Sequence, residues 1–255
     1  MRKHVRYLVL LLILLFVALN EMSLRLNTAS WERPLEVHVY AISGDGRAAS
    51  ERYVAALDSD DFKAMELFVN REARRYELPW DAIRVTYHAG LDSHPPQPPA
   101  GDNILENIFW SLRFRAWAWR HQWSGSGGDG DVELFVNYYD TATSQSLRHS
   151  VGLRGGLIGI INAFADPSYR GSNHVVIVHE LMHTLGATDK YGANNMPRYP
   201  DGYAEPYRQP VLPQRRAEIM GGRIPLSASE ARIPRSLAEV SIGVVTAAEI
   251  YWIGD

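Results

Sequence analysis

The stretch VHELMHTLGATDKY, residues 178–191, constrains this chain more than any other. Successive residues of an α-helix turn by about 100°, so His179 and His183 would lie one turn apart on the same face. That spacing suits two neighbouring ligands of a tetrahedral metal ion. Glu180 is displaced sideways, where it could reach a water molecule as a general base without binding the metal itself.

A catalytic zinc ion normally has three protein ligands and keeps one position open, so the two histidines need a partner. Gly186 can adopt the left-handed conformation that ends a helix and reverses the chain. Asp189 lies three residues further on, where the reversed chain could return it to the metal. Glu205 and Glu218 are the alternatives, because a distant glutamate completes some metal sites.

The opposite face of this helix is apolar and is expected to pack into the core, through Ile177, Leu181 and Leu185. His174 falls on the same buried side and is therefore excluded as a ligand. Two other interpretations stay open. The histidines could be purely structural, or the chain could be an inactive descendant that keeps its metal.

The complete string, H-E-x-x-H-x-x-G-x-x-D, resembles the metzincin clan of zinc metallopeptidases. It matches the variant whose third ligand is Asp, which snapalysin-like and immune-inhibitor-like peptidases have. The resemblance implies a Zn²⁺ ion bound by His179, His183 and Asp189. It also implies that Glu180 is the general base.

Metzincins carry a methionine in a tight turn beneath the metal, and AEIMGG supplies Met220 here. The resemblance gives Met220 and Gly186 a supporting role, although Met220 could also be ordinary core filler. Several clan members have a tyrosine two residues after this methionine, where this chain has Gly222. A tyrosine that assists the reaction must then come from elsewhere, and the candidates are Tyr191, Tyr199, Tyr203 and Tyr207.

The pattern along the chain favours an α/β (α+β) fold. Strands are expected at residues 36–42, 82–89, 132–139 and 155–165, and helices at 50–77, 104–123, 172–186 and 246–252. The resemblance implies a metzincin-like architecture: a twisted mixed sheet with backing helices, and an active-site helix above a small irregular C-terminal subdomain. The strand before that helix would form the edge of the cleft and pair with an extended substrate.

The domain organisation follows from the same pattern. Residues 1–30 are an N-terminal signal-anchor or signal peptide, and residues 31–255 are a zinc metallopeptidase domain. Within that domain we expect an upper subdomain at 31–186 and a lower subdomain at 187–255.

The N-terminus has the pattern of an export signal, with the basic start MRKHVR and an unbroken apolar run over residues 7–19. The basic residues would stay in the cytoplasm, so the rest of the chain is expected outside it. No clear small-x-small cleavage site follows the run, which favours a membrane anchor over a cleaved signal peptide. If the segment is cleaved, the protein is expected to be periplasmic or secreted.

The composition of the chain limits the kinds of molecule and ligand that it is expected to bind. The net charge of −3 gives no indication of a nucleic-acid partner, and the absence of cysteine excludes thiolate ligands and disulfides. In the helix expected at 104–123, Trp110, Phe114 and Trp117 share one face. Core packing against a sheet explains this stripe better than a ligand platform. The sequence leaves the oligomeric state open.

These features predict an exported zinc endopeptidase that hydrolyses protein or peptide substrates, with Glu180 as the general base. The alternative is a non-catalytic, zinc-containing envelope binding module that holds a partner through its Trp-rich helix and the Pro-rich loop at 93–102. A hydrolase acting on an amide outside peptides is a third possibility. The cleavage preference cannot be read from the sequence, because the irregular region after Asp189 would form the pocket walls.

Overall fold

A five-stranded mixed sheet lies at the centre of the structure, a computed structural model that describes residues 30–253 except 92, 100, 102, 124–129, 145 and 154–155. The strand order is β2-β1-β3-β5-β4. The strands β1, β2, β3 and β5 run parallel, and β4 pairs antiparallel with β5 at one edge. The strand bounds are β1 Leu35–Ser43, β2 Ile83–Ala89, β3 Val132–Tyr139, β4 Val151–Gly152 and β5 Ile158–Phe164.

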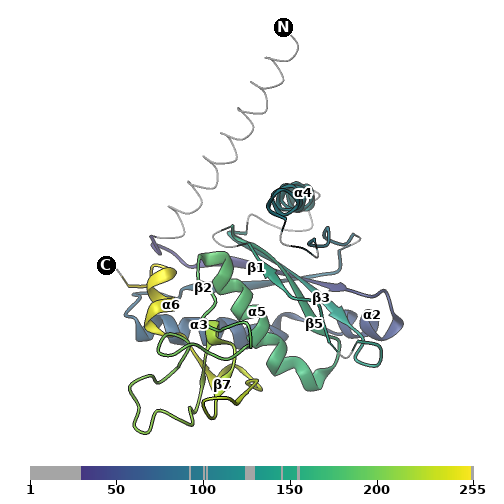
Figure 1. The fold of residues 1–255 in the computed structure, drawn as a ribbon. Coiled ribbons are helices and arrows are strands. Elements are labelled where there is room, and N and C mark those ends of the chain that lie inside the picture. Colours follow the sequence, from purple (N-terminus) through teal and green to yellow (C-terminus); the bar gives the residue numbers. More distant parts are fainter. Residues whose placement is uncertain are drawn as a thin grey trace.

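Helices cover both faces of this sheet (Figure 1). Their bounds are α2 Ala48–Ala55, α3 Lys63–Arg75, α4 Ile104–Trp123, α5 Arg170–Leu185 and α6 Val244–Glu249. One face packs in a large apolar cluster with α3, α5 and the C-terminal region, whereas the other face packs against α4. The chain is therefore a mixed α/β protein with a twisted mixed sheet, as its sequence predicts.

The alternation of side chains along β1 explains why two separate clusters form. Val37 and Val39 point to the large cluster, while Tyr40 and Ile42 point to the cluster under α4. Because successive residues of a strand face opposite sides, a strand that is apolar at both sets of positions must be covered on both faces. This places α4 and α5 on opposite sides of the sheet.

The helix expected at 50–77 was a wrong prediction in one respect, because the structure divides it into α2 and α3. Asp58 causes the break. Its carboxylate accepts a hydrogen bond from the Asp60 N–H at 2.9 Å, and the Asp61 carboxylate accepts one from the Asp58 N–H at 3.0 Å. This reciprocal cap starts a short 3₁₀ helix, Ser59–Asp61, and α3 begins immediately beyond it.

The aromatic stripe of α4 packs against the sheet, as expected. Phe114 is fully buried, and its ring lies 5.8 Å from that of Phe135 on β3. The Trp117 ring meets the same phenylalanine edge-on at 4.8 Å. This face of α4 is therefore occupied by the core.

In the described residues after α5, every strand is only two residues long. They form two two-stranded sheets, of β6 Ala217–Glu218 with β9 Val240–Ser241 and of β7 Ile224–Pro225 with β8 Ala231–Arg232. The boundary expected at residue 186 stays a prediction. The segment expected to be an anchor or signal peptide lies outside the described residues. Across residues 30–253, with the gaps given above, no helix is long and apolar enough to cross a membrane.

Candidate metal centre

The helix α5 presents both histidines of the motif on one face. Their rings lie 4.8 Å apart, centre to centre, and are almost perpendicular at 87°. Residues on the other side of the helix anchor it in the core, since Ile177 and Leu181 are fully buried and Leu185 is nearly so. The rigid packing of this face fixes the direction in which the histidines point.

The chain reverses at Gly186, as the sequence predicts. Gly186 has φ of 120°, a conformation that side chains disfavour. Its N–H donates to the His183 carbonyl at 3.0 Å, and the Ala187 N–H donates to the Met182 carbonyl at 3.0 Å. These bonds satisfy the last carbonyls of α5 and return the chain towards the histidines.

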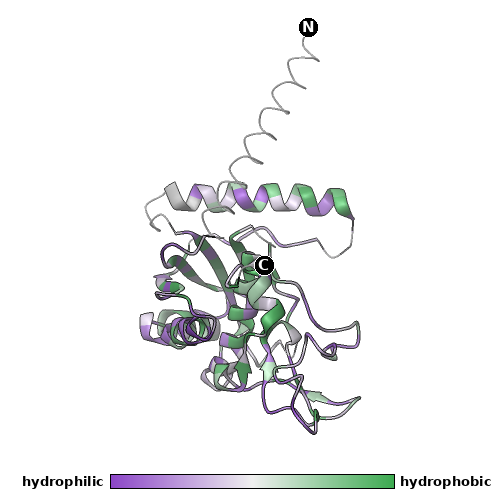
Figure 2. Cartoon of the chain, turned by 90° about the vertical axis from the view of Figure 1, so that its left-hand side faces the viewer, coloured by the Kyte–Doolittle hydropathy of each residue, from purple (hydrophilic) through white to green (hydrophobic). Residues whose placement is uncertain are grey.

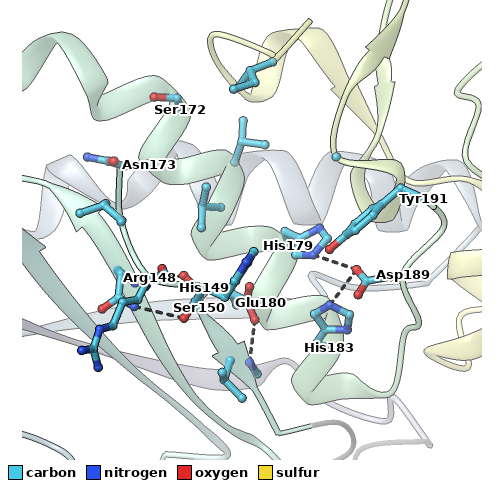
Figure 3. A pocket seen from close by; sticks show the side chains of 18 of the residues that line it. Arg148, His149, Ser150, Ser172, Asn173, His179, Glu180, His183, Asp189 and Tyr191 are labelled. Carbon is cyan, nitrogen blue, oxygen red and sulfur yellow. Dashed lines mark hydrogen bonds and ion pairs between the residues drawn. The ribbon is translucent and has the colours of Figure 1, made fainter. Parts of the chain in front are cut away.

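Asp189 comes back to the two imidazoles. Its Oδ1 lies 3.2 Å from His179 Nε2 and 3.1 Å from His183 Nε2. One ligand atom from each of these residues falls within 4.8 Å of the others, a group of the size needed to hold a metal ion. The structure therefore brings together the ligand set predicted from the sequence (Figure 3).

Both histidines are held by main-chain carbonyls through their other ring nitrogen. His179 Nδ1 lies 2.9 Å from the Ile219 carbonyl oxygen, and His183 Nδ1 lies 2.9 Å from that of Ala187. A carbonyl only accepts, so each Nδ1 carries the hydrogen and Nε2 keeps its lone pair when the ring is neutral. This tautomer is the one a metal ligand needs, and the donor set of two imidazole nitrogens and a carboxylate oxygen suits zinc.

Met220 lies in a tight turn directly beside this site. The turn contains the 3₁₀ helix Ile219–Gly221 and closes at Gly222, which has φ of 70°. Met220 is fully buried, and its carbonyl accepts a hydrogen bond from the Lys190 N–H at 2.8 Å. The turn thus connects the carbonyl that holds His179 to the loop that carries Asp189.

Glu180 is buried next to the cluster. Its Oε2 accepts a hydrogen bond from the Gly152 N–H on β4 at 2.6 Å. Burial raises the pKa of Glu180, and this effect outweighs the two neighbouring histidines and the Gly152 N–H, which lower it. A carboxylate with a raised pKa is a better proton acceptor than an exposed one.

Charges at the cluster are strongly coupled. Burial opposes the ionisation of Asp189, but hydrogen bonds from His179 and His183 outweigh it and hold the pKa of Asp189 far below its usual value. Burial likewise lowers the pKa of His179, but the Asp189 hydrogen bond and the Glu180 charge reverse the effect, so this pKa is raised. Asp189 is therefore held in its ionised form, and its negative charge favours a cation at this position.

A residue far along the chain supports the loop that carries Asp189. Glu249, the last residue of α6, accepts hydrogen bonds from the Thr188 N–H at 2.9 Å and from Lys190 Nζ at 2.7 Å. Lys190 is almost completely buried, and its Nζ also donates to the Thr188 carbonyl at 3.0 Å. The residues on both sides of Asp189 are thus fixed by one carboxylate. No sequence motif indicates this role.

A cavity of about 850 Å³ opens over the cluster. The segment at 147–152 forms one wall, and α5 and the chain at 187–191 line other parts of the cavity. The remaining lining residues are Asn162 and Phe164 of β5, Tyr169, Gly222 and Ile233. The strand at this wall is β4, so the expectation that the strand at 155–165 forms the cleft edge is wrong. The two-residue β4 covers β5 and is too short to be detected as a periodic pattern.

Of the four candidate tyrosines, Tyr191 lines this cavity. Its ring stacks against His179 with centres 6.3 Å apart, and burial raises its pKa. Tyr199 and Tyr207 are exposed, and Tyr203 pairs with Ala217 away from the cavity walls. Figure 3 shows the Tyr191 side chain directed to the same space as Asp189.

The alternative ligands lie elsewhere. The Glu218 carboxylate is buried and accepts hydrogen bonds from the Gly221 N–H at 2.8 Å and from Thr246 Oγ1 at 2.7 Å. Glu205 and Glu218 are not in the ligand group found among the described residues. His174 is buried beside Phe62, as expected from its side of the helix.

No family model and no curated protein matches the chain. The crystal structure of wild-type OgpA from Akkermansia muciniphila is similar with a TM-score of 0.37 and 13% identity, over 86% of this chain and 60% of that chain. Catalytically inactive OgpA in complex with an O-glycopeptide (glycodrosocin) substrate gives a TM-score of 0.35 and 12% identity, over 86% and 59%. This chain thus spans about 60% of the length of OgpA. At such low identity, function does not transfer with the backbone.

Proposed function

We propose that this chain is a zinc-dependent endopeptidase. The observation that carries the proposal is the convergence of two Nε2 atoms on the Asp189 carboxylate in a cavity that also contains Glu180. Each Nε2 has a lone pair for a metal ion when its ring is neutral, because each Nδ1 is bonded to a carbonyl. The residues that would hold the ion are His179, His183 and Asp189. Bound Zn²⁺ would polarise a peptide carbonyl and lower the pKa of water at the site.

Glu180 would act as the general base. Its Oε2 is held by the Gly152 N–H, so Oε1 is the atom that accepts a proton from water as the water attacks the peptide carbonyl carbon. Glu180 then returns this proton to the nitrogen of the leaving amine as the C–N bond breaks. One water is consumed and two peptides are released, without a covalent enzyme intermediate.

Tyr191 would stabilise the oxygen that becomes negative during the attack. Its ring lines the cavity beside His179, and its raised pKa keeps the hydroxyl protonated at neutral pH, so that it can donate a hydrogen bond. The exposed edge of β4 would bind an extended peptide through main-chain hydrogen bonds, since Val151 and Gly152 both line the cavity.

The proposal is tested by metal analysis of the purified full chain, followed by digestion of a proteome-derived peptide library. We expect one zinc ion per chain and internal cleavage of peptides. The matched control is Glu180→Gln, which keeps the shape of the side chain and all three ligands. This variant should bind zinc like the wild type and lose about 10²–10⁴-fold in rate. Wild-type turnover in this variant would refute the role of Glu180.

The rival function, a non-catalytic binding module, would be favoured by a chain that binds zinc but cleaves no peptide in the library. The fold gives less support to the Trp-rich helix, α4, as the binding surface of such a module. Trp110 and Phe114 are buried against the sheet, so this stripe of α4 is not available to a partner.

A further inference from the structure

The outer face of α4 is apolar and exposed to solvent. Its apolar residues and their exposed fractions are Ile104 73%, Leu105 76%, Ile108 52%, Phe109 65%, Leu112 42% and Trp119 57%. At 100° per residue they fall on one arc of about 140°. A face of this kind on an otherwise water-soluble surface marks an interaction site.

The inner face of α4 does not explain this arc. Trp110, Phe114 and Ala118 lie on the other side of the helix and already form its contact with the sheet. A helix that is apolar on both sides is expected to be covered on both sides. Figure 2 shows α4 lying along one end of the molecule, with no other described element on its outer side.

The charges of α4 indicate that the surface that binds its outer face is negatively charged. Arg113 and Arg120 are exposed and lie along one border of the apolar arc. Arg115 falls within the arc but is half-buried, and Glu106, in the first turn, is the one acidic residue of the helix. A mixture of Trp, Phe and Leu with bordering arginines is typical of helices that lie in the interface of an anionic bilayer.

The chain upstream of the domain would keep α4 near such a bilayer. The sequence predicts that the apolar run at 7–19 enters the membrane, and Ser30 is only the eleventh residue after its end. Eleven residues reach at most about 40 Å, comparable with the diameter of a domain of this size. A short tether raises the effective concentration of the domain at the surface, so even a weak contact would form.

The start of the domain lies beside the start of β3, the strand that follows α4 in the sequence. Val37 on β1 pairs with Val132 at the start of β3, and Arg33 forms a 2.6 Å salt bridge with Asp131. The described chain therefore begins beside the strand that follows α4 in the sequence.

We propose that α4 lies flat in the interface of an anionic phospholipid bilayer, with its outer apolar face among the acyl chains and Arg113 and Arg120 at the phosphates. This binding surface is independent of the metal centre, which lies on the other side of the sheet. The proposal concerns lipid, as opposed to a second copy of the chain or a protein partner.

The absence of cysteine allows one fluorescent label per chain to be introduced by mutation. The full chain carrying Leu105→Cys or Leu112→Cys, labelled with an environment-sensitive fluorophore, is reconstituted into vesicles of equal parts phosphatidylglycerol and phosphatidylcholine. Tyr207→Cys, at a position that is 88% exposed in a loop, is the matched control. Lipids that carry a quencher on the acyl chain should quench both α4 labels strongly and the control label little.

Several results would overturn the proposal. The α4 labels could remain as solvent-like as the control, or the full chain could fail to associate with the vesicles. The α4 labels could also shift to an apolar signal that lipid-borne quenchers do not reduce, which would indicate that protein covers this face. Quenching that is unchanged in pure phosphatidylcholine would contradict the anionic requirement, whereas a clear reduction would support it.

Discussion

At the scale of single residues, the site depends on which nitrogen of each histidine carries the hydrogen. The carbonyls of Ile219 and Ala187 make this choice for His179 and His183. The sequence motif predicts the two side chains and their common face. It does not predict these carbonyls, because one of them comes from 40 residues downstream and any residue type can supply a carbonyl.

Asp189→Ala tests the third of the predicted ligands. Removal of its carboxylate leaves two imidazoles, so zinc affinity should fall by more than the roughly 10–100-fold that is typical of losing an outer contact. Equilibrium zinc titration of both proteins measures the difference. Equal affinities would exclude Asp189 from the metal site.

Gly152→Ala tests the wall of the site. A Cβ at this position would lie 2.5 Å from the Glu180 carbonyl oxygen and 2.8 Å from His183 Cβ, so β4 and α5 would have to move apart. Hydrolysis should fall sharply because the Gly152 N–H would no longer hold Glu180. Gly101→Ala is the matched control, since a Cβ there meets nothing within 4 Å. Equal rates in the two variants would contradict this role.

At the scale of elements, α6 holds the loop that carries Asp189. Glu249→Gln keeps the size of the side chain but leaves the buried ammonium of Lys190 without its ionic partner. We expect zinc affinity to fall by about 10–100-fold, as is usual for residues that orient a ligand. Asp81→Asn, which breaks an exposed ion pair with Arg74, is the control and should leave affinity unchanged. Unaltered affinity in Glu249→Gln would show that the loop is rigid without α6.

The region around β8 should contribute a pH-dependent part of stability. Hydrogen bonds from Arg232 and from the Arg235 N–H lower the pKa of Glu239 from the ordinary 4.5 to about 2. A lowered pKa in the folded state stabilises the fold fully above about pH 4.5, and the effect is lost as pH falls towards 2. Urea unfolding of wild type and Glu239→Gln should therefore differ by a constant amount near neutrality and converge in acid. A difference that is the same at all pH values would contradict this.

Elements could be predicted from the sequence where a pattern extends over many residues. The strand expected at 132–139 and the helix expected at 104–123 have the bounds predicted for them. The break between α2 and α3 and the two-residue strand β4 could not be predicted as easily. Each depends on a few side-chain or main-chain bonds that a periodic pattern does not contain.

At the scale of the whole molecule, the fold class could be predicted because strand and helix patterns alternate along the chain, which indicates an α/β fold. The strand order could not, since nothing in the residues of β4 indicates that it turns back along β5. The roles of Gly152 and Glu249 are hidden for the same reason. Both act on residues that are distant in sequence and are brought close only by the complete fold.

The position of the sheet between α4 and α5 has a consequence for which proteins could be cut. If α4 rests on lipid, the helix and sheet layers, each about 10 Å thick, hold the metal roughly 20 Å above the surface. An extended chain covers about 3.3 Å per residue, so a segment that leaves the membrane must run for about six residues before it reaches Glu180. The protein would then cleave only those segments that extend at least this far from the bilayer, and proteins that lie close to the membrane surface would not be cleaved.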